Sequence, residues 1–226
     1  MGAQVIAIDG PAASGKSTIA AGVARRLHIP YVNTGNMYRA VTLHVLRCGV
    51  DPLDRQAVAG LLPEIVLDYR PDVDGNYEIY LNGAAPGGAI RAPEVTAAVS
   101  PLSAIPEVRA YLLDKQRSFA GFGLIVMEGR DIGTVIFPDA DYKFFLTATP
   151  EARARRRLAQ GGETPDGATV QSVAAEIAER DRRDSSRVIA PLKQAQDAIL
   201  IDSSDLTVEQ VLELIIEQVT KHAPGN

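Results

Sequence analysis

The 226-residue sequence contains no tryptophan and one cysteine, and only 5% of its residues are aromatic. The lone Cys48 excludes an internal disulfide and any metal site built from several cysteines. Basic residues are not in excess, because 23 Lys and Arg face 28 Asp and Glu, for a formal net charge of −5. The chain therefore lacks the overall positive charge of a sequence-independent nucleic-acid-binding protein, and we expect no nucleic-acid partner.

Long apolar runs are also missing. No stretch approaches the ~20 apolar residues of a membrane-spanning helix, and the apolar segment Val5–Ile8 is too short for a signal peptide. We therefore expect a soluble, cytoplasmic protein with no membrane association. The composition is otherwise globular, with 46% hydrophobic and 23% charged residues, and the length suits a single domain over residues 1–226.

Short apolar segments alternate with amphipathic helical patterns along the chain, which predicts an α/β fold with a five-stranded parallel sheet and helices on both faces. The predicted strands are Gln4–Ile8, His28–Val32, Leu124–Met127, Tyr142–Leu146 and Ala198–Ile201. The predicted helices are Lys16–Leu27, Asn36–Arg47, Arg55–Leu62, Pro93–Ser100, Pro106–Phe119, one capped by Thr149, Val170–Asp184 and a last one with a Thr207–Gln210 capping box and an apolar face that includes Val208. Alternating patterns in residues 65–69 and 77–81 predict an inserted antiparallel hairpin.

The strongest motif matches G-x-x-x-x-G-K-[ST] between a predicted strand and a predicted helix. It consists of Gly10, Pro11, Ala12, Ala13, Ser14, Gly15, Lys16 and Ser17, followed by Thr18. Its glycines let backbone N–H groups converge on phosphate oxygens at a helix N-terminus. We expect Lys16 to reach the terminal phosphates of ATP or GTP, Ser17 to ligate Mg²⁺ and Thr18 to add a further donor.

Two further segments, residues 34–39 and 129–134, follow predicted strands and should lie at the same edge of the sheet as this phosphate loop. Tyr38 and Arg39 would suit an acceptor phosphate, although Tyr38 suits the core equally well. In the second segment, Arg130 would hold phosphate and Asp131 would accept from the amino group of cytosine, which uracil lacks.

Arginine outnumbers lysine by 18 to 5, and nine of the arginines fall between residues 130 and 187. The guanidinium fork grips phosphate at two points, so an acidic chain with clustered arginine indicates small phosphorylated ligands. Salt bridging on helix surfaces is the competing interpretation, because acidic residues are interspersed. The spacing of Arg180, Arg183, Asp184 and Arg187 predicts one shared, anion-binding helical face.

Taken together, these segments resemble the bacterial cytidylate kinase family over residues 4–220. The most specific parts are GRDIGTVIFPDA at residues 129–140 and ERDRRDSSR at residues 179–187. The resemblance implies a P-loop kinase core with a nucleotide-monophosphate-binding insert at residues 64–91 and a lid at residues 153–168. It also implies transfer of the γ-phosphate of ATP, with Mg²⁺, to CMP or dCMP. We expect these small molecules to be the only partners of a monomer.

By motif match, the resemblance implies a role for each candidate residue. Arg39, Arg130 and Arg180 would hold the acceptor phosphate, and Thr34 and Tyr38 would border it. Ser100, Arg109 and Asp131 would read cytosine, while Asp184 and Arg187 would hold the sugar. Lys16, Arg130 and Arg180, with Arg153 and Arg157 from the lid, form the predicted catalytic set that neutralises the phosphates.

One position departs from the family, which usually has Asp before the Thr/Ser-Gly where this chain has Asn33. Asn keeps an acceptor oxygen but loses the charge that would hold Mg²⁺ through water, so we expect weaker metal binding or slower turnover. Glu128 is then the better carboxylate candidate near the metal. Its alternative role is to act as a buried partner of Arg130.

Two other hypotheses remain open. One is a P-loop kinase for another small acceptor, such as UMP, shikimate or dephospho-coenzyme A. The other is a P-loop ATP-binding module that phosphorylates no acceptor. Turnover with a series of acceptors separates the three.

Overall fold

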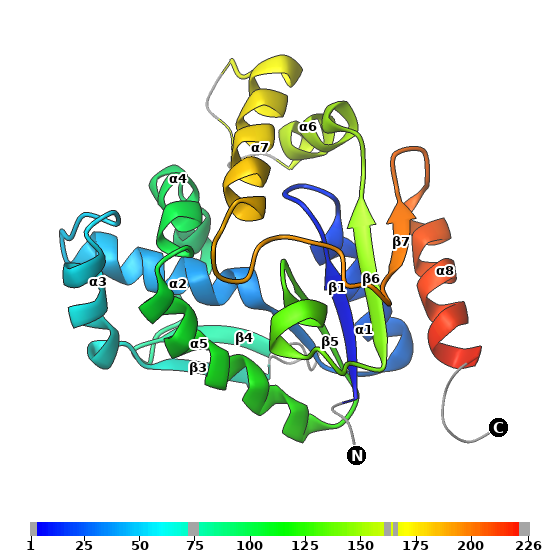
Figure 1. Cartoon of the computed structure of the whole chain (residues 1–226), viewed down its shortest axis with the longest axis horizontal. Coiled ribbons are helices and arrows are strands. Elements are labelled where there is room, and N and C mark those ends of the chain that lie inside the picture. The colour runs from blue at the N-terminus through cyan, green and yellow to red at the C-terminus, as the bar shows by residue number, and fades with distance from the viewer. Residues whose placement is uncertain (1–3, 72–76, 161–163, 165–166, 222–226) are drawn as a thin grey trace.

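A computed structural model, which describes residues 4–71, 77–160, 164 and 167–221, has a five-stranded parallel sheet at its centre (Figure 1). The strands are β1 (Val5–Asp9), β2 (Tyr31–Asn33), β5 (Ile125–Gly129), β6 (Tyr142–Thr147) and β7 (Ile199–Asp202), in the order β2-β5-β1-β6-β7. β1 is the central strand, and the chain crosses from one side of it to the other, with β5 and β2 on one side and β6 and β7 on the other. The carboxyl end of β1 is therefore the switch point at which sheets of this kind bind ligands.

Helices cover both faces of this sheet, as predicted. Ile6 and Ile8 of β1 pack in one core cluster with α1 (Lys16–Leu27) and α8 (Val208–Lys221). Val5 and Ala7, which alternate with them, belong to the opposite cluster, which contains α2 (Thr34–Arg47), α4 (Pro93–Leu102) and α5 (Pro106–Ser118). Burial on both faces explains why the strands read as continuous apolar runs.

Several predicted boundaries shift by a few residues for local reasons. Helix α2 begins at Thr34 rather than Asn36, because the Asn33 side chain accepts a hydrogen bond from Asn36 N and caps the helix. The predicted caps at Thr149 and at Thr207–Gln210 are confirmed. The placement of Val208 in the apolar face of α8 is wrong, because Val208 is the first residue of the helix and is half exposed.

The inserted hairpin is confirmed as β3 (Leu67–Pro71) paired antiparallel with β4 (Tyr77–Leu81). Helix α3 (Arg55–Leu61) precedes it, and the short helix η2 (Gly87–Arg91) follows it and leads into α4. The predicted turn between the strands, at residues 72–76, lies outside the described residues. The assignment of residues 64–91 to a separate insert stays a prediction.

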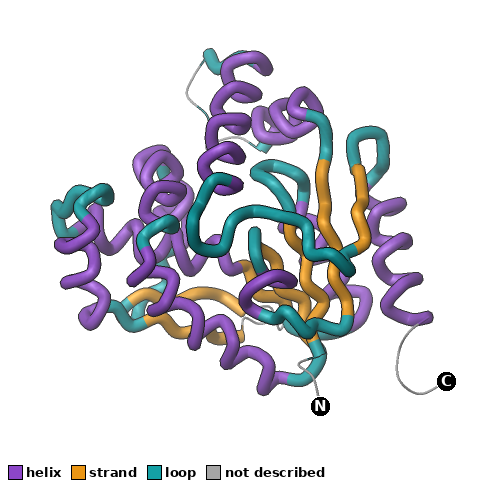
Figure 2. The backbone as a smooth tube through the Cα atoms, in the orientation of Figure 1, coloured by secondary structure: helices purple, strands orange, loops and turns teal. Residues whose placement is uncertain are grey.

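Two helices, α6 (Pro150–Ala159) and α7 (Val170–Ser185), stand over the carboxyl end of the sheet (Figure 2). Ala154, Val173 and Ile177 form a small apolar cluster between them that includes Ala12 of the phosphate loop. Residues 153–159 of the predicted lid are thus the last seven residues of α6, while 161–163 and 165–166 lie outside the described residues. In the described part of the chain, no helix is long and apolar enough to span a membrane.

Candidate active site

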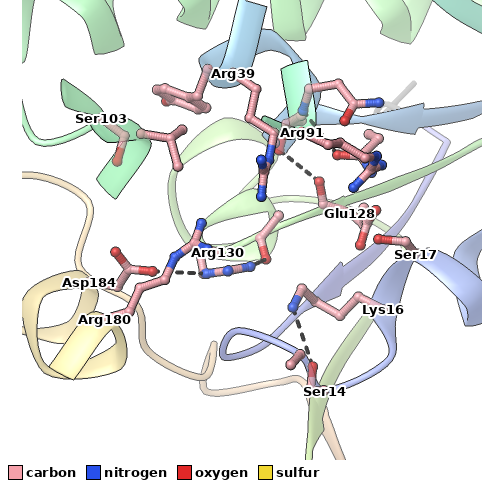
Figure 3. Close-up of a pocket in the computed structure, with 18 of the residues that line it drawn as sticks. Ser14, Lys16, Ser17, Arg39, Arg91, Ser103, Glu128, Arg130, Arg180 and Asp184 are labelled. Atoms are coloured by element: carbon pink, nitrogen blue, oxygen red, sulfur yellow. Dashed lines mark hydrogen bonds and ion pairs between the residues drawn. The ribbon is translucent and has the colours of Figure 1, made fainter. Parts of the chain in front are cut away.

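A cavity of about 650 Å³ lies at the carboxyl end of the sheet, bordered by the phosphate loop, α2, η2, α4, the β5 loop and α7. Figure 3 shows Lys16 and Ser17 on one side of it, Arg39 and Arg91 on another, and Arg130 between them. Its acidic side chains are Glu128, Asp131 and Asp184, while its cationic ones are Lys16, Arg39, Arg91, Arg109, Arg130, Arg157, Arg180 and Arg187. This excess of positive charge suits a ligand that carries several phosphates.

The phosphate loop folds as its motif predicts. A Cβ at Gly10 would stand 2.0 Å from the carbonyl oxygen of Leu146, so only glycine lets the loop leave β1 against β6. Ala13 (φ 57°) and Gly15 (φ 94°) then adopt left-handed conformations that curl the backbone before α1. The residues from Ala13 to Thr18 border the cavity, whereas Gly10, Pro11 and Ala12 lie behind it.

Lys16 is a buried cation held inside its own loop. Its Nζ donates to Pro11 O at 2.6 Å and to Ser14 Oγ at 3.3 Å. Burial and the nearby Arg130 charge lower the pKa of Lys16 well below its usual value, against the pull of Glu128. A phosphate placed in the cavity would offset the cost of keeping Lys16 charged in this buried site, because its negative charge favours the ammonium form.

Side-chain oxygen and nitrogen atoms from β2 and β5 meet beside Ser17. The Tyr31 hydroxyl donates to Glu128 Oε1 at 2.6 Å and accepts from Asn33 Nδ2 at 3.1 Å. Thr34 Oγ1 donates to Glu128 O at 2.7 Å, which joins the ends of β2 and β5. Ser17, Asn33 and Glu128 all border the cavity. The alternative role of Glu128 finds no support, since Arg130 pairs instead with Asp184.

The three arginines predicted to hold the acceptor phosphate come together from three elements. Arg39 of α2 donates to Ile90 O and Thr96 Oγ1, and Arg130 Nε donates to Asp184 at 3.1 Å. The buried Nε of Arg180 makes no hydrogen bond in the described part of the chain. Burial and then the Arg130 charge lower the pKa of Arg180 from its usual value. An unsatisfied buried donor among like charges is a place where an anion would be strongly stabilised.

Asp184 is the carboxylate that these cations share. It is 2% exposed and accepts from Arg130, Arg187 and Ser100 Oγ. Although burial opposes it, the charges of Arg130 and Arg187 hold the pKa of Asp184 below its usual value. Arg187 also donates to Ser103 Oγ at 2.6 Å. The result is a rigid polar wall made by α4 and the end of α7.

Asp131 and Arg109 form a second buried ion pair at the edge of the cavity. Burial raises the pKa of Asp131, and the Arg109 charge opposes that shift. The Arg109 guanidinium lies 5.5 Å from the ring centre of Tyr38. Tyr38 belongs to the core cluster and also borders the cavity, so its place in the core is confirmed and its contact with an acceptor phosphate stays a prediction.

The structure separates some predicted site residues from the cavity. Arg153 does not border it, because its guanidinium pairs with Asp181 and donates to the carbonyl oxygens of Ala12 and Ala148. Ser100 does not border it either, although its hydroxyl donates to Asp184, which does. The predicted shared face of α7 is wrong for Arg183, which turns outward to Glu179, while Arg180 turns inward.

Sequence reasoning missed several residues that shape the site. Ser103 borders the cavity one helical turn after Ser100, and Arg91 borders it from η2. Asp181 accepts from Ala12 N at 3.0 Å, and Arg156 donates to Ser14 O at 3.3 Å, so α6 and α7 both grip the phosphate loop. The three-residue spacing of Ser100 and Ser103 was a usable signal for Ser103, because residues so spaced share a helical face. Contacts between residues as distant in sequence as Ala12 and Asp181 leave no signal in the sequence.

Residues 6–221 match the sequence model of a family described as cytidylate kinase. A protein named cytidylate kinase from Mycobacterium avium is 47% identical, with 97% of this chain and 96% of the relative covered. Another, from Pelotomaculum thermopropionicum, is 45% identical over 95% of each chain. A bifunctional pantoate ligase/cytidylate kinase from Synechococcus is 47% identical over 93% of this chain and 43% of that longer protein.

Among solved structures, a shikimate kinase from Bacteroides thetaiotaomicron matches with a TM-score of 0.51 and 14% identity, covering 96% of this chain and 98% of the other. An uncharacterised protein from Eubacterium ventriosum matches with a TM-score of 0.53 at the same identity and coverage. These two matches concern the fold alone.

The two candidate lid arginines should respond differently to substitution. Arg153→Met leaves the Asp181 carboxylate without its buried partner, so we expect it to lower the free energy of unfolding by about 2–4 kcal/mol. Arg157→Met removes a guanidinium that borders the cavity, so we expect it to weaken ATP binding. Urea denaturation and ATP titration of both variants provide the measurement. Weaker ATP binding with full stability in the Arg153 variant would contradict the assignment.

Proposed function

This chain belongs to the cytidylate kinase family, and we propose that the cavity described above is where it transfers the γ-phosphate of ATP to CMP or dCMP. The observation that carries the proposal is the cluster of Arg39, Arg130 and Arg180 in the same cavity as Lys16 of the phosphate loop. One set of cations would hold the donor's phosphates and the other the acceptor's. We expect the enzyme to act as a monomer.

The acceptor phosphate is a dianion and is itself the nucleophile. One of its oxygens bonds to the γ-phosphorus as the bond to the β-phosphate oxygen breaks, and CDP or dCDP leaves with ADP. No general base is required, so the protein contributes alignment and charge neutralisation. Lys16 and Arg157 would serve the donor phosphates, and Arg130, which lies beside Arg180 and Asp184 in Figure 3, would face both nucleotides.

Magnesium would be held by oxygen atoms on the wall that carries Ser17 and Glu128. Mg²⁺ is usually bound by one or two carboxylates together with phosphate oxygens and water. The Ser17 hydroxyl and the Glu128 carboxylate, both at the cavity surface, fit that donor set. When bound, the ion would neutralise charge that develops on the transferred phosphate. Tyr31 orients Glu128 through its 2.6 Å hydrogen bond.

The Asp131–Arg109 pair supports selection of cytosine. The carboxylate would accept from the amino group of the base, and Arg109 would keep that carboxylate ionised in its buried setting. Asp184 and Arg187 would face the sugar, with Ser100 and Ser103 fixing them in place. Uracil carries a carbonyl oxygen where cytosine has the amino group, so it would repel Asp131.

The proposal is tested by the production of ADP from ATP and Mg²⁺ with CMP, dCMP, UMP, AMP, shikimate or no acceptor. We expect strong turnover with CMP and dCMP alone. Preference for another acceptor would leave phosphoryl transfer standing and overturn the substrate assignment. Binding of ATP without dependence on any acceptor would favour the ATP-binding module instead.

Restoring the usual family residue with Asn33→Asp should strengthen metal binding. The new carboxylate can still cap α2, and we expect half-saturation at an Mg²⁺ concentration lower by ~10-fold, equivalent to ~1.4 kcal/mol. Asn82→Asp, in the exposed turn after β4, adds the same charge far from the cavity and should change nothing. If the Asn33 variant keeps both its Mg²⁺ dependence and its turnover, the metal is not held near this position.

Replacing the proposed base-reading carboxylate by Asp131→Asn should raise the KM for CMP and narrow the preference for CMP over UMP. A loss of ~10–100-fold in that preference corresponds to one good base contact. Asp139→Asn removes the same charge from an exposed position in the following segment and serves as the control. An unchanged ratio of kcat/KM for the two nucleotides would exclude Asp131 from base recognition.

A further inference from the structure

Asp9 is a buried carboxylate that the proposed mechanism does not use. It is the last residue of β1, immediately before Gly10 of the phosphate loop, and its residue is 4% exposed. It does not border the cavity. Its two oxygens accept from Ile132 N at 2.9 Å and from Gly133 N at 2.8 Å. Asp9 thus joins the start of the donor-binding loop to the turn that follows Arg130 and Asp131.

The turn needs this carboxylate because its own capping residue is engaged elsewhere. Residues Ile132–Ile136 form a single π-helical turn, η4, with Asp131 at the N-cap position. An aspartate there would ordinarily accept from the first free N–H groups of the turn. The Asp131 side chain instead turns to Arg109 and makes no capping bond. Asp9 satisfies the N–H groups from a neighbouring strand, which leaves Asp131 available to the cavity.

The surroundings of Asp9 make its charge costly. Burial raises its pKa from 3.8 to about 7, against the two backbone hydrogen bonds, and the Asp131 charge adds to the shift. Lys16 opposes the shift from the phosphate loop. Lys143 of β6 packs against Gly133 on the same side, with its Nζ bonded to Asp197 and Pro138 O. In the described part of the chain, no ion pair of Asp9 itself is found.

We propose that Asp9 is a positioning residue for phosphoryl transfer, which holds Arg130 and Asp131 in a fixed position relative to the phosphate loop. The inference rests on the proposed function, because this relative position matters only if donor and acceptor bind side by side. Positional errors of about 1 Å between reacting groups cost up to ~100-fold in rate. The two bonds at Asp9 directly connect the backbones that carry the two half-sites.

Asp9→Asn provides the test. The two N–H groups bond to different oxygens of Asp9. The amide nitrogen cannot accept, so one of these N–H groups loses its acceptor atom in the variant. We expect kcat/KM for CMP to fall between about 10- and 100-fold and the preference for CMP over UMP to narrow. ATP binding without acceptor should weaken far less than CMP turnover, since residues 13–18 keep their own contacts and Lys16 loses only the nearby charge of Asp9.

The pH dependence distinguishes positioning from a merely structural role. Wild-type Asp9 loses its charge as the pH falls through about 7, so the wild type should then approach the variant. The ratio of the wild-type kcat/KM to that of the variant should be largest above that pH and shrink below it. Titration of CMP and of other groups affects both proteins equally and cancels in this ratio. Because the folded-state pKa is raised, ionisation of Asp9 lowers stability between pH 3.8 and about 7. Loss of the charge in the variant therefore does not by itself destabilise the fold.

Thr134→Val is the matched control, because Thr134 lies in the same turn and its buried hydroxyl has no hydrogen-bond partner among the described residues. It should leave kinetics, pH dependence and ATP binding unchanged. Asp9→Ser, which keeps one small acceptor, replaces the asparagine variant if that variant does not fold. Protection of the Ile132 and Gly133 amides from hydrogen exchange should fall in the Asp9 variant and not in the control.

Amide exchange needs no acceptor, so it tests the bonds even if the proposed function fails in the acceptor series. Unaltered CMP kinetics in the Asp9 variant, with the two amides exposed, would overturn the positioning role. An equal loss of ATP binding and CMP turnover would also overturn it, because that pattern indicates damage to the phosphate loop itself.

Discussion

Crowding of positive charge around one cavity is the constraint on which the rest of the site depends. Its arginines and its lysine outnumber its carboxylates, and both Lys16 and Arg180 carry lowered pKa values that record the cost. The chain offsets part of that cost with buried carboxylates, chiefly Asp184 and Asp131, each of which pairs with arginine. Phosphate groups would offset the remainder. Without them, the cations of the cavity repel one another, and phosphate-bearing substrates would relieve this repulsion on binding.

The parallel sheet makes such crowding possible. Its strands all end at one edge, so loops from distant parts of the chain meet there. Asn33, Gly129 and Asp9 occupy corresponding ends of β2, β5 and β1. Cross-links such as Thr34 to Glu128 and Asp9 to Gly133 then hold these loops at defined separations. Helices α6 and α7 complete the enclosure through Arg156 and Asp181, which bond to the phosphate loop.

Local features of the chain were predictable because short-range physics decides them. The left-handed Gly15 and the start of α1, the Thr149 cap and the hairpin of β3 and β4 all follow from neighbouring residues. Arginine orientation was not predictable in this way. Arg180 and Arg183 are three residues apart, a spacing that places side chains on neighbouring positions of one helical face, yet Arg183 pairs with Glu179 and turns outward. Arg153 and Arg157 lie one turn apart in α6, and partners from other elements, among them Asp181 of α7, hold Arg153 in the interior.

The sequence by itself determined the class of fold, the phosphate loop and the set of charged residues at the strand ends, since each is encoded within a few neighbouring positions. Only the tertiary structure decided which polar groups meet. Asp9 finds Ile132 and Gly133 because the register of β1 against β5 places Asp9 beside Gly129. Such a pairing depends on the packing of the whole sheet, and a hydrogen bond between residues more than a hundred positions apart leaves no periodic or local trace in the chain.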